Sequence, residues 1–389
     1  MTCCEMTLCI PCKGKGLCGR EQCPVISRFH AQMKTTPRSE YVGTTPSIFV
    51  GSSGYPDVSA GPLLTADQDH PPEWMNRDLS IADIVNIRAQ TIRATTLPHR
   101  YEDHLQEIAR SSVPLGVETA FDRPVSFDLR FDGMVAPMGM SGNIRSFDLL
   151  DNAKVERVVD RITSDTDLPA AGACHELTEG GTDTYRIISL MSAGLLGTEK
   201  SRHMVPTRWA ITAVDDTLGK NLKPQVFRFP DYESISLFYS KRFGNAIAVI
   251  LLPGDWQFEM IEIWGSQSLW AGGNETIVAD REGRTKTGYS PITGAYYSAR
   301  LAILEFLTAI NRNARVIVIR WITSEYWAPL GTWVIREVTR QAMASPPSHH
   351  ENITAVVSTA SAALGMDRWT AHSTLLTEIR TQRSLADFF

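Results

Sequence analysis

Hydrophobic and polar positions along this chain recur with two periods, one helical and one typical of strands. A helix is predicted to start at Ser80, a good N-cap residue, and the longest helix is predicted over 295–311. Further helices are expected near residues 101–110, 157–161, 184–196, 334–343, 352–363 and 369–380. Strands are expected at residues 48–50, 125–131, 208–214, 238–252, 256–264 and 315–322. The strands at 238–252 and 256–264 are predicted to form a hairpin around Pro253. This mixture predicts an α+β fold.

The length of 389 residues exceeds that of one ordinary hydrophobic core, so two packed mixed α/β domains are expected. A Gly/Thr-rich stretch at 170–184 suggests the boundary between them. The expected organisation comprises an N-terminal module at 1–36, two α+β domains at 37–180 and 181–375, and a flexible tail at 376–389.

Composition narrows the class of protein. Hydrophobic residues make up 43% and charged residues 21% of the chain, as in a folded globular protein. The net charge is −5, so any contact with DNA must come from a local basic patch. The sequence contains no apolar run long enough to span a membrane and begins without a signal-peptide layout, which predicts a cytoplasmic protein.

Six of the seven cysteines lie in the first 23 residues, a density that in a reducing compartment favours metal binding over disulfides. The expected ligands of one tetrahedral site are Cys9, Cys12, Cys18 and Cys23, with glycines between them that allow tight turns. Zinc is the expected metal, and an iron–sulfur cluster is the alternative. Cys3 and Cys4 are spare thiols that could replace a ligand.

The chain ends in Gln-x-x-Leu-x-x-Phe-Phe, formed by Gln382, Leu385, Phe388 and Phe389. This spacing puts an aliphatic and an aromatic side chain on one side of a single helical turn. The pattern resembles the peptide by which replication and repair proteins bind the sliding clamp, proliferating cell nuclear antigen (PCNA). The alternative is a terminal helix whose Leu and Phe pack on the protein's own surface.

A Gly/Ser-rich loop, 51–54, follows the predicted strand 48–50. Such a loop can present backbone N–H groups to a phosphate, but it lacks the Walker lysine and the dinucleotide-binding spacing, so an ordinary turn is the favoured interpretation. Tyr55 offers a stacking face beside this loop, and Asp57 a carboxylate.

Several short motifs together resemble one known family. They are Leu17-Cys18-Gly19, Cys23-Pro24, Gly54-Tyr55-Pro56, Val58–Leu63 and Val205–Asp216. With the terminal peptide, they are similar to those of the archaeal Nre DNA repair family. The resemblance implies a DNA repair protein that works with the sliding clamp, and it does not supply a reaction.

Three functional hypotheses remain. The first is a clamp-tethered repair factor that binds DNA and has no chemistry of its own. The second is a repair enzyme acting on nucleotides, NAD or DNA, with Arg208, Asp215 and Glu325 as the catalytic candidates. Arginines of this set, which also includes Arg300 and Arg320, would hold phosphates while a carboxylate acts as base. The third is a zinc-stabilised interaction protein whose terminal Phe pair is coincidental.

Overall fold

The computed structural model describes residues 12–13, 15–17, 22–65, 70–97, 100–127, 136–268 and 274–381. They form two compact units. The N-terminal unit contains the residues up to Asn221 together with Ala328–Leu330, and the C-terminal unit contains the remainder. The division falls inside helix α9 (Thr207–Val226), not at the expected position between residues 180 and 181.

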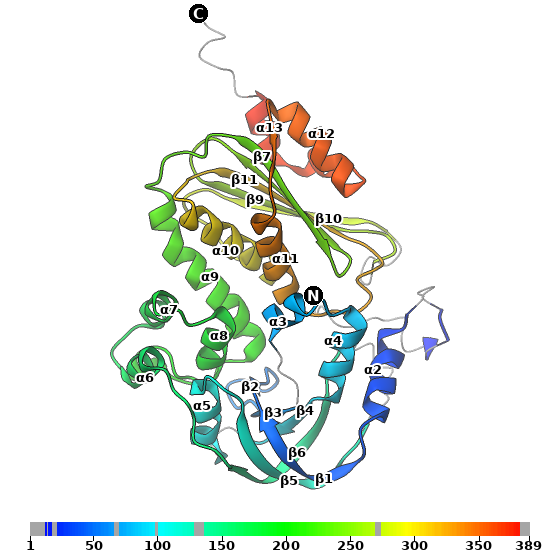
Figure 1. The fold of residues 1–389 in the computed structure, drawn as a ribbon, viewed down its shortest axis with the longest axis vertical. Coiled ribbons are helices and arrows are strands. Elements are labelled where there is room, and N and C mark those ends of the chain that lie inside the picture. The colour runs from blue at the N-terminus through cyan, green and yellow to red at the C-terminus, as the bar shows by residue number, and fades with distance from the viewer. Residues whose placement is uncertain are drawn as a thin grey trace, which may run out of the picture. The chain divides into compact units, whose positions relative to one another are not determined.

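The N-terminal unit is built on a six-stranded mixed sheet with the order β1-β5-β6-β4-β3-β2 (Figure 1). Neighbouring strands are antiparallel except for β4 and β6, which are parallel. The strands are β1 (Arg38–Thr45), β2 (Ser47–Val50), β3 (Ala60–Leu64), β4 (Ile92–Thr95), β5 (Leu115–Val125) and β6 (Met140–Leu149).

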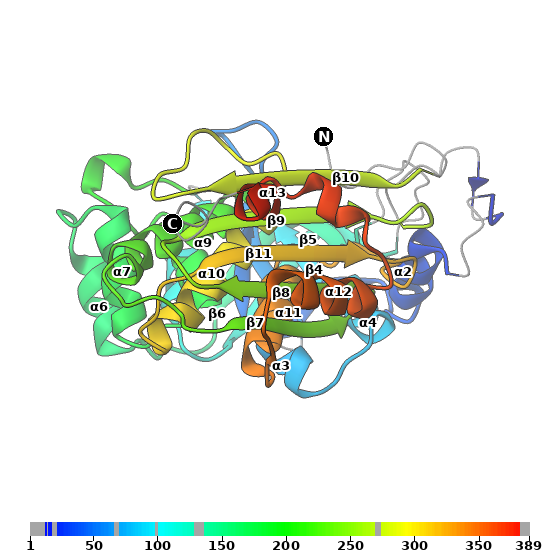
Figure 2. The ribbon, with the colours of Figure 1, turned by 90° about the horizontal axis from the view of Figure 1, so that it is seen from above.

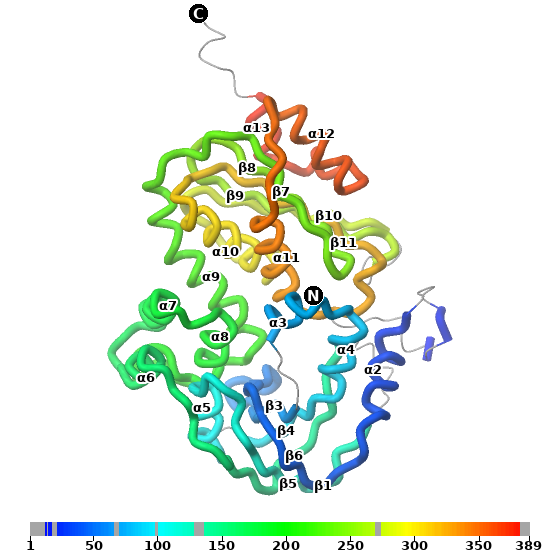
Figure 3. Tube along the Cα trace, viewed as in Figure 1, coloured from blue at the N-terminus to red at the C-terminus, as the bar shows by residue number. Residues whose placement is uncertain are grey.

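The helices of this unit are α2 (Pro24–Met33), α3 (Pro71–Asn76), α4 (Ile81–Gln90), α5 (Glu102–Arg110), α6 (Arg157–Ser164), α7 (Ala170–Glu179), α8 (Thr184–Ser192), the 3₁₀ helix η2 (Glu199–Ser201) and the start of α9. Helices α2 and α4 lie side by side (Figure 3). Ser80 caps α4 as predicted, because its hydroxyl accepts the N–H of Asp83 while the Asp83 carboxylate accepts the N–H of Ser80.

The Gly/Thr-rich stretch at 170–184 lies within the N-terminal unit. Helix α7 occupies most of it and packs against α6 and α8, and α8 packs against α5. The glycines serve the connection between helices: Gly180 ends α7 and Gly181 has a φ of +82°. The Gly/Thr-rich composition at this point therefore marks a turn between two helices of the N-terminal unit, and not the boundary between the units.

The C-terminal unit is also built on a six-stranded mixed sheet, with the order β10-β9-β11-β8-β7-β12. Its strands are β7 (Ile235–Arg242), β8 (Asn245–Leu252), β9 (Gln257–Trp264), β10 (Thr276–Glu282), β11 (Arg315–Ile322) and β12 (Ser348–His350). Its helices are α10 (Gly294–Ala309), α11 (Trp333–Ala344), α12 (Ile353–Leu364), the 3₁₀ helix η3 (Arg368–His372) and α13 (Thr374–Thr381). Figure 2 shows α12 and α13 lying across one face of this sheet.

Both faces of the C-terminal sheet are covered, which explains the continuous apolar run in β8. Every residue of β8 is buried. Alternate residues of this strand, including Ala248 and Ile250, pack with Val356 and Leu375 from the helices on one face. Helix α11 packs against β7 and β8 as well. A strand covered on both faces loses the alternation of polar and apolar residues that marks a half-exposed strand.

Four sequence predictions of local structure are corrected. Strands β8 and β9 do not form a hairpin, because β11 lies between them and pairs with both. Residues 208–214 form part of α9 rather than a strand, since Ala210, Val214 and Leu218 are buried at helical spacing. At 20 residues α9 is also longer than α10, which has 16. The predicted strand at 125–131 meets β5 only at Val125, and residues 128–135 lie outside the described part of the chain.

No helix among the described residues is long and apolar enough to cross a membrane. The α+β prediction with two sheet-containing units is confirmed.

Candidate functional site

Three aromatic side chains gather at the surface of the N-terminal unit, and we call Tyr55, His203 and Trp209 the aromatic surface. The ring of Tyr55 lies 5.0 Å from that of Trp209 in an edge-to-face arrangement and 6.3 Å from that of His203. Tyr55 is 41% exposed and Trp209 is 42% exposed. Large aromatic side chains are costly to leave in water, so their clustering at the surface makes this place the candidate binding site.

Two chain segments far apart in sequence build the aromatic surface. The loop after β2 is closed by a hydrogen bond from Gly51 N to Ser59 O, 2.8 Å, and is anchored by the fully buried side chain of Val58. The loop joins the start of α9, where the backbone N–H of Val50 donates to Thr207 Oγ1 at 2.9 Å. The Gly54-Tyr55-Pro56 motif and the Val205–Asp216 motif thus meet at one place.

A cationic group accompanies the aromatic surface. Arg208 precedes Trp209 in the first turn of α9 and is exposed. The first turn of α9 also presents the positive end of the helix dipole. Arg202, in contrast, has a structural role, since it donates to the carbonyl oxygens of Gly197, Thr163 and Asp165. Exposed rings beside an exposed arginine suit stacking on bases together with contacts to phosphates.

The three predicted catalytic residues occupy different environments. Arg208 is exposed, whereas Asp215, two turns further along α9, is fully buried. Glu325 belongs to the C-terminal unit, where its exposed carboxylate forms an ion pair with Lys241 at 2.9 Å. Arg208 and Asp215 therefore do not face a common solvent-accessible space.

Two arginines that the enzyme hypothesis included are buried in ion pairs of the C-terminal unit. Arg300 donates to Glu282 at 2.8 Å, and Lys223 donates to the same carboxylate at 2.8 Å. Next to them, burial and then the charge of Glu282 raise the pKa of the Tyr296 hydroxyl well above its usual range. Arg320 pairs with Glu262 and donates to Asn245 Oδ1 at 2.9 Å. These contacts assign Arg300 and Arg320 to the core.

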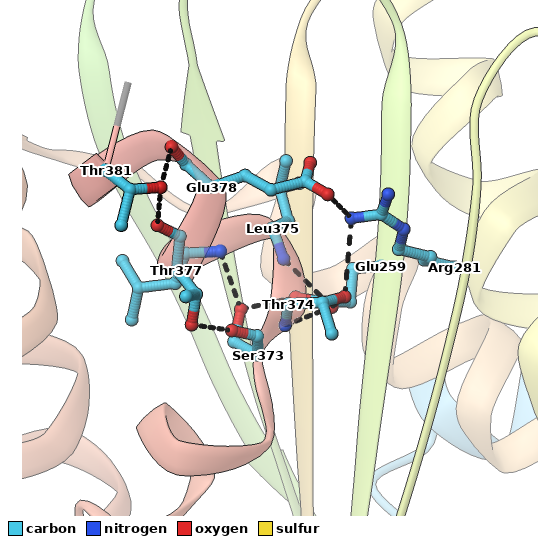
Figure 4. A network of polar contacts seen from close by, with 9 residues as sticks. Glu259, Arg281, Ser373, Thr374, Leu375, Thr377, Glu378 and Thr381 are labelled. Atoms are coloured by element: carbon cyan, nitrogen blue, oxygen red, sulfur yellow. Dashed lines mark hydrogen bonds and ion pairs between the residues drawn. The ribbon is translucent and has the colours of Figure 1, made fainter. Parts of the chain in front are cut away.

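Helix α13, which directly precedes the terminal peptide, is fixed to the C-terminal sheet by Glu259 of β9 (Figure 4). The Glu259 carboxylate is buried and accepts hydrogen bonds from the Ser373 hydroxyl, from the backbone N–H groups of Thr374 and Leu375, and from the Thr374 hydroxyl. A carboxylate that receives the first N–H groups of a helix stabilises both the helix and its position. An exposed ion pair from Arg281 to Glu378 adds a second contact.

A polar depression of about 320 Å³ lies beside α13. Arg281, Arg284, Asp255, Glu282 and Glu378 supply its charged lining. None of Arg208, Asp215 and Glu325 lines it.

The described part of the cysteine cluster contains Cys12 and Cys23. Cys12 is buried, and its Sγ accepts the backbone N–H of Leu17 at 3.3 Å across a turn that includes Gly16, whose φ is +76°. Cys23 immediately precedes α2. Amide donation to a cysteine sulfur in a tight Gly-containing turn is compatible with a thiolate ligand. Among the described residues no group of three potential metal ligands is found, and Cys9 and Cys18 lie outside them.

The four residues predicted to bind the clamp, Gln382, Leu385, Phe388 and Phe389, also lie outside the described residues. Sequence reasoning recognised Tyr55 as a stacking residue but missed Trp209 and His203. The missed signal was the helical spacing of Ala210, Val214 and Leu218, which puts Trp209 on the side opposite the buried residues of α9.

The fold and the aromatic surface define an α+β protein with two six-stranded mixed sheets and a group of exposed aromatic rings on its N-terminal unit. The chain belongs to the archaeal Nre family: the family model "Archaeal Nre, N-terminal" matches residues 17–271, and "Archaeal Nre, C-terminal" matches residues 281–388.

Curated relatives agree with this assignment. The chain is 35% identical to DNA repair protein NreA of Archaeoglobus fulgidus over 98% of each chain, and 32% identical to DNA repair protein NreB of the same organism over 98% of this chain and 99% of the relative. It is 38% identical to DNA repair protein NreA of Haloferax volcanii over 78% of each chain. No solved structure matches the chain.

Proposed function

We propose that this protein is a DNA repair factor that binds unpaired DNA through its aromatic surface and is brought to DNA by the sliding clamp. The relatives' names support the repair assignment. The observation that carries the DNA-binding part is the meeting of Tyr55, His203 and Trp209 beside Arg208. Stacking rings select unpaired bases, because the faces of bases inside a duplex are covered by the neighbouring base pairs.

The net negative charge of the protein explains why recruitment by the sliding clamp would be useful. With a net charge of −5, general attraction to the DNA backbone is weak, so affinity depends on local contacts. Docking on a ring that encircles DNA raises the effective concentration of a tethered partner to roughly millimolar. Weak binding by the aromatic surface then suffices.

The double variant Tyr55→Ala/Trp209→Ala is expected to bind single-stranded oligonucleotides at least tenfold more weakly than the wild type. Stacking contributes about 1–3 kcal/mol per base, and the variant removes two rings. Titration of a fluorescently labelled oligonucleotide, followed by anisotropy, measures the change.

The matched control is Tyr289→Ala, which removes a 64% exposed tyrosine from the C-terminal unit. It should leave the affinity unchanged. Equal affinities of the wild type and the double variant would rule out the aromatic surface as the DNA contact.

Clamp recruitment is proposed to use Gln382, Leu385, Phe388 and Phe389. Support comes from their match to the clamp-binding pattern and from the fixed position of α13, which ends at Thr381. Because α13 is anchored directly before the peptide, binding of the peptide to the clamp would also hold the folded protein at the clamp. The order of the segments thus suits a tether.

The N-terminal cysteines are proposed to hold one zinc ion through Cys9, Cys12, Cys18 and Cys23. The buried Sγ of Cys12 and its hydrogen bond from Leu17 N support this assignment. A bound zinc would join the segment before α2 into a folded module and contribute directly to its stability.

Cys12→Ser is expected to reduce the zinc content of the purified protein from about one ion per chain towards zero. Elemental analysis measures it, and absorbance near 400 nm would instead reveal an iron–sulfur cluster. Cys174→Ser is the matched control, because Cys174 is buried in α7 and burial raises the pKa of its thiol to about 12, which keeps it protonated. Unchanged zinc content in Cys12→Ser would exclude Cys12 as a ligand.

A further inference from the structure

The angle between the rings of Tyr55 and Trp209 limits how a base can lie on the aromatic surface. The centres of these rings are 5.0 Å apart and their planes are inclined by 62°, in an edge-to-face arrangement. Stacked bases lie about 3.4 Å apart, so a base between two rings needs ring planes that are parallel and roughly 7 Å apart. Tyr55 and Trp209 therefore cannot enclose one base between their faces. Tyr55 and His203 cannot do so either, since their planes are inclined by 58°.

The chain segments that carry the two rings hold them at this angle. Trp209 lies in the first turn of α9, where its backbone N–H donates to Pro206 O at 2.8 Å and the next residue, Ala210, is fully buried. The loop that carries Tyr55 is anchored three residues further on by the fully buried Val58. A parallel arrangement of the two rings would require one of these packed segments to move.

Both residues are exposed, so each ring can accept a base on its own accessible face. Two bases that stack on planes inclined by 62° are not parallel, and they cannot stack on each other at the same time. Binding of two neighbouring bases to Tyr55 and Trp209 therefore replaces one base–base contact by two base–ring contacts. The cost of this replacement depends on how strongly the free strand is stacked.

From this geometry we propose that the aromatic surface binds two neighbouring bases in an unstacked conformation and therefore prefers pyrimidine-rich unpaired DNA. This inference rests on the proposed binding of unpaired DNA and specifies the kind of strand that is bound. Consecutive adenines stack strongly on one another and stiffen a single strand, whereas consecutive thymines stack weakly. An adenine run thus loses its own stacking when it binds, and a thymine run loses little.

Anisotropy titrations with labelled oligo-dT and oligo-dA of equal length test this preference. The two strands carry the same number of phosphates, so contacts to the backbone contribute equally to both affinities. The wild type is expected to bind oligo-dT roughly fivefold more tightly than oligo-dA. Tyr55→Ala removes the ring that is inclined to Trp209, and stacking of one base on Trp209 alone does not require its neighbour to turn away. This variant should therefore bind both strands more weakly and with nearly equal affinities.

Tyr55→Phe is the matched control, because it keeps the ring and removes only the hydroxyl group. It should retain the preference for oligo-dT. Thermal unfolding of both variants checks the fold, and neither should differ from the wild type, since the side chain of Tyr55 is exposed.

The possible results separate this inference from the proposed function. Equal affinities of the wild type for oligo-dT and oligo-dA would overturn the inference and leave the proposed binding of unpaired DNA intact. An unchanged preference in Tyr55→Ala would also overturn it, because the preference would then not depend on two inclined rings. Absence of binding to both strands would contradict the proposed function and the inference together.

Discussion

Replacing Phe388 and Phe389 together by alanine is expected to abolish binding to the sliding clamp while leaving the stability of the protein unchanged. Burying two phenylalanine rings in a partner contributes about 3–6 kcal/mol, so the affinity should fall at least a hundredfold. Calorimetric titration of the purified clamp into the wild type and the double variant measures the change, and thermal unfolding of both measures stability.

The matched control for this experiment is Arg380→Ala, which changes an exposed residue near the end of α13 just before the peptide. It should leave the heat of binding close to that of the wild type. Equal heats of binding for the wild type and the double Phe variant would refute the proposal that the terminal peptide binds the clamp. A large loss of thermal stability in the double variant would instead favour the alternative that the Phe pair packs on the protein's own surface.

Glu282→Ala should destabilise the C-terminal unit by about 3–5 kcal/mol, because it removes the shared partner of two buried cations. The side chains of Lys223 and Arg300 are 8% and 1% exposed, and that of Glu282 is fully buried. Without the carboxylate, both buried cations lose the negative charge that they share. Urea unfolding followed by tryptophan fluorescence gives the difference in free energy of unfolding.

Glu378→Ala is the matched control for the buried pair. It removes a carboxylate that also pairs with an arginine of the same unit, but its side chain is 51% exposed. A surface ion pair of this kind contributes less than about 1 kcal/mol. If the two variants lost similar amounts of stability, burial would not be the reason why the Glu282 ion pairs stabilise the C-terminal unit.

The local pattern of the sequence predicted most elements because their causes are local. The cap at Ser80 depends on residues three positions apart, and β11 depends on the short apolar run 316–319. The pairing of β11 between β8 and β9 could not be predicted in the same way. It depends on which strands meet in space, and a turn such as Pro253–Asp255 is compatible with either a hairpin or a longer crossing.

The functional residues show the same difference between features set by neighbouring residues and features set by distant ones. Tyr55 was recognised from its place after a Gly/Ser loop, but Trp209 became a candidate only when α9 placed it 5.0 Å from Tyr55. Arg300, Arg320 and Asp215 looked suitable for chemistry, yet burial puts all three in the core. The sequence alone does not show which residue a charged side chain at the end of a predicted element will contact in the fold.

The sequence by itself determined the α+β class, the family resemblance, the grouped cysteines and the terminal Gln-x-x-Leu-x-x-Phe-Phe pattern, since each is written in neighbouring residues. Only the tertiary structure decided the strand order, the position of the unit boundary inside α9 and the aromatic surface. These depend on residues distant in the chain, and their interaction energies exist only once the fold has brought them together.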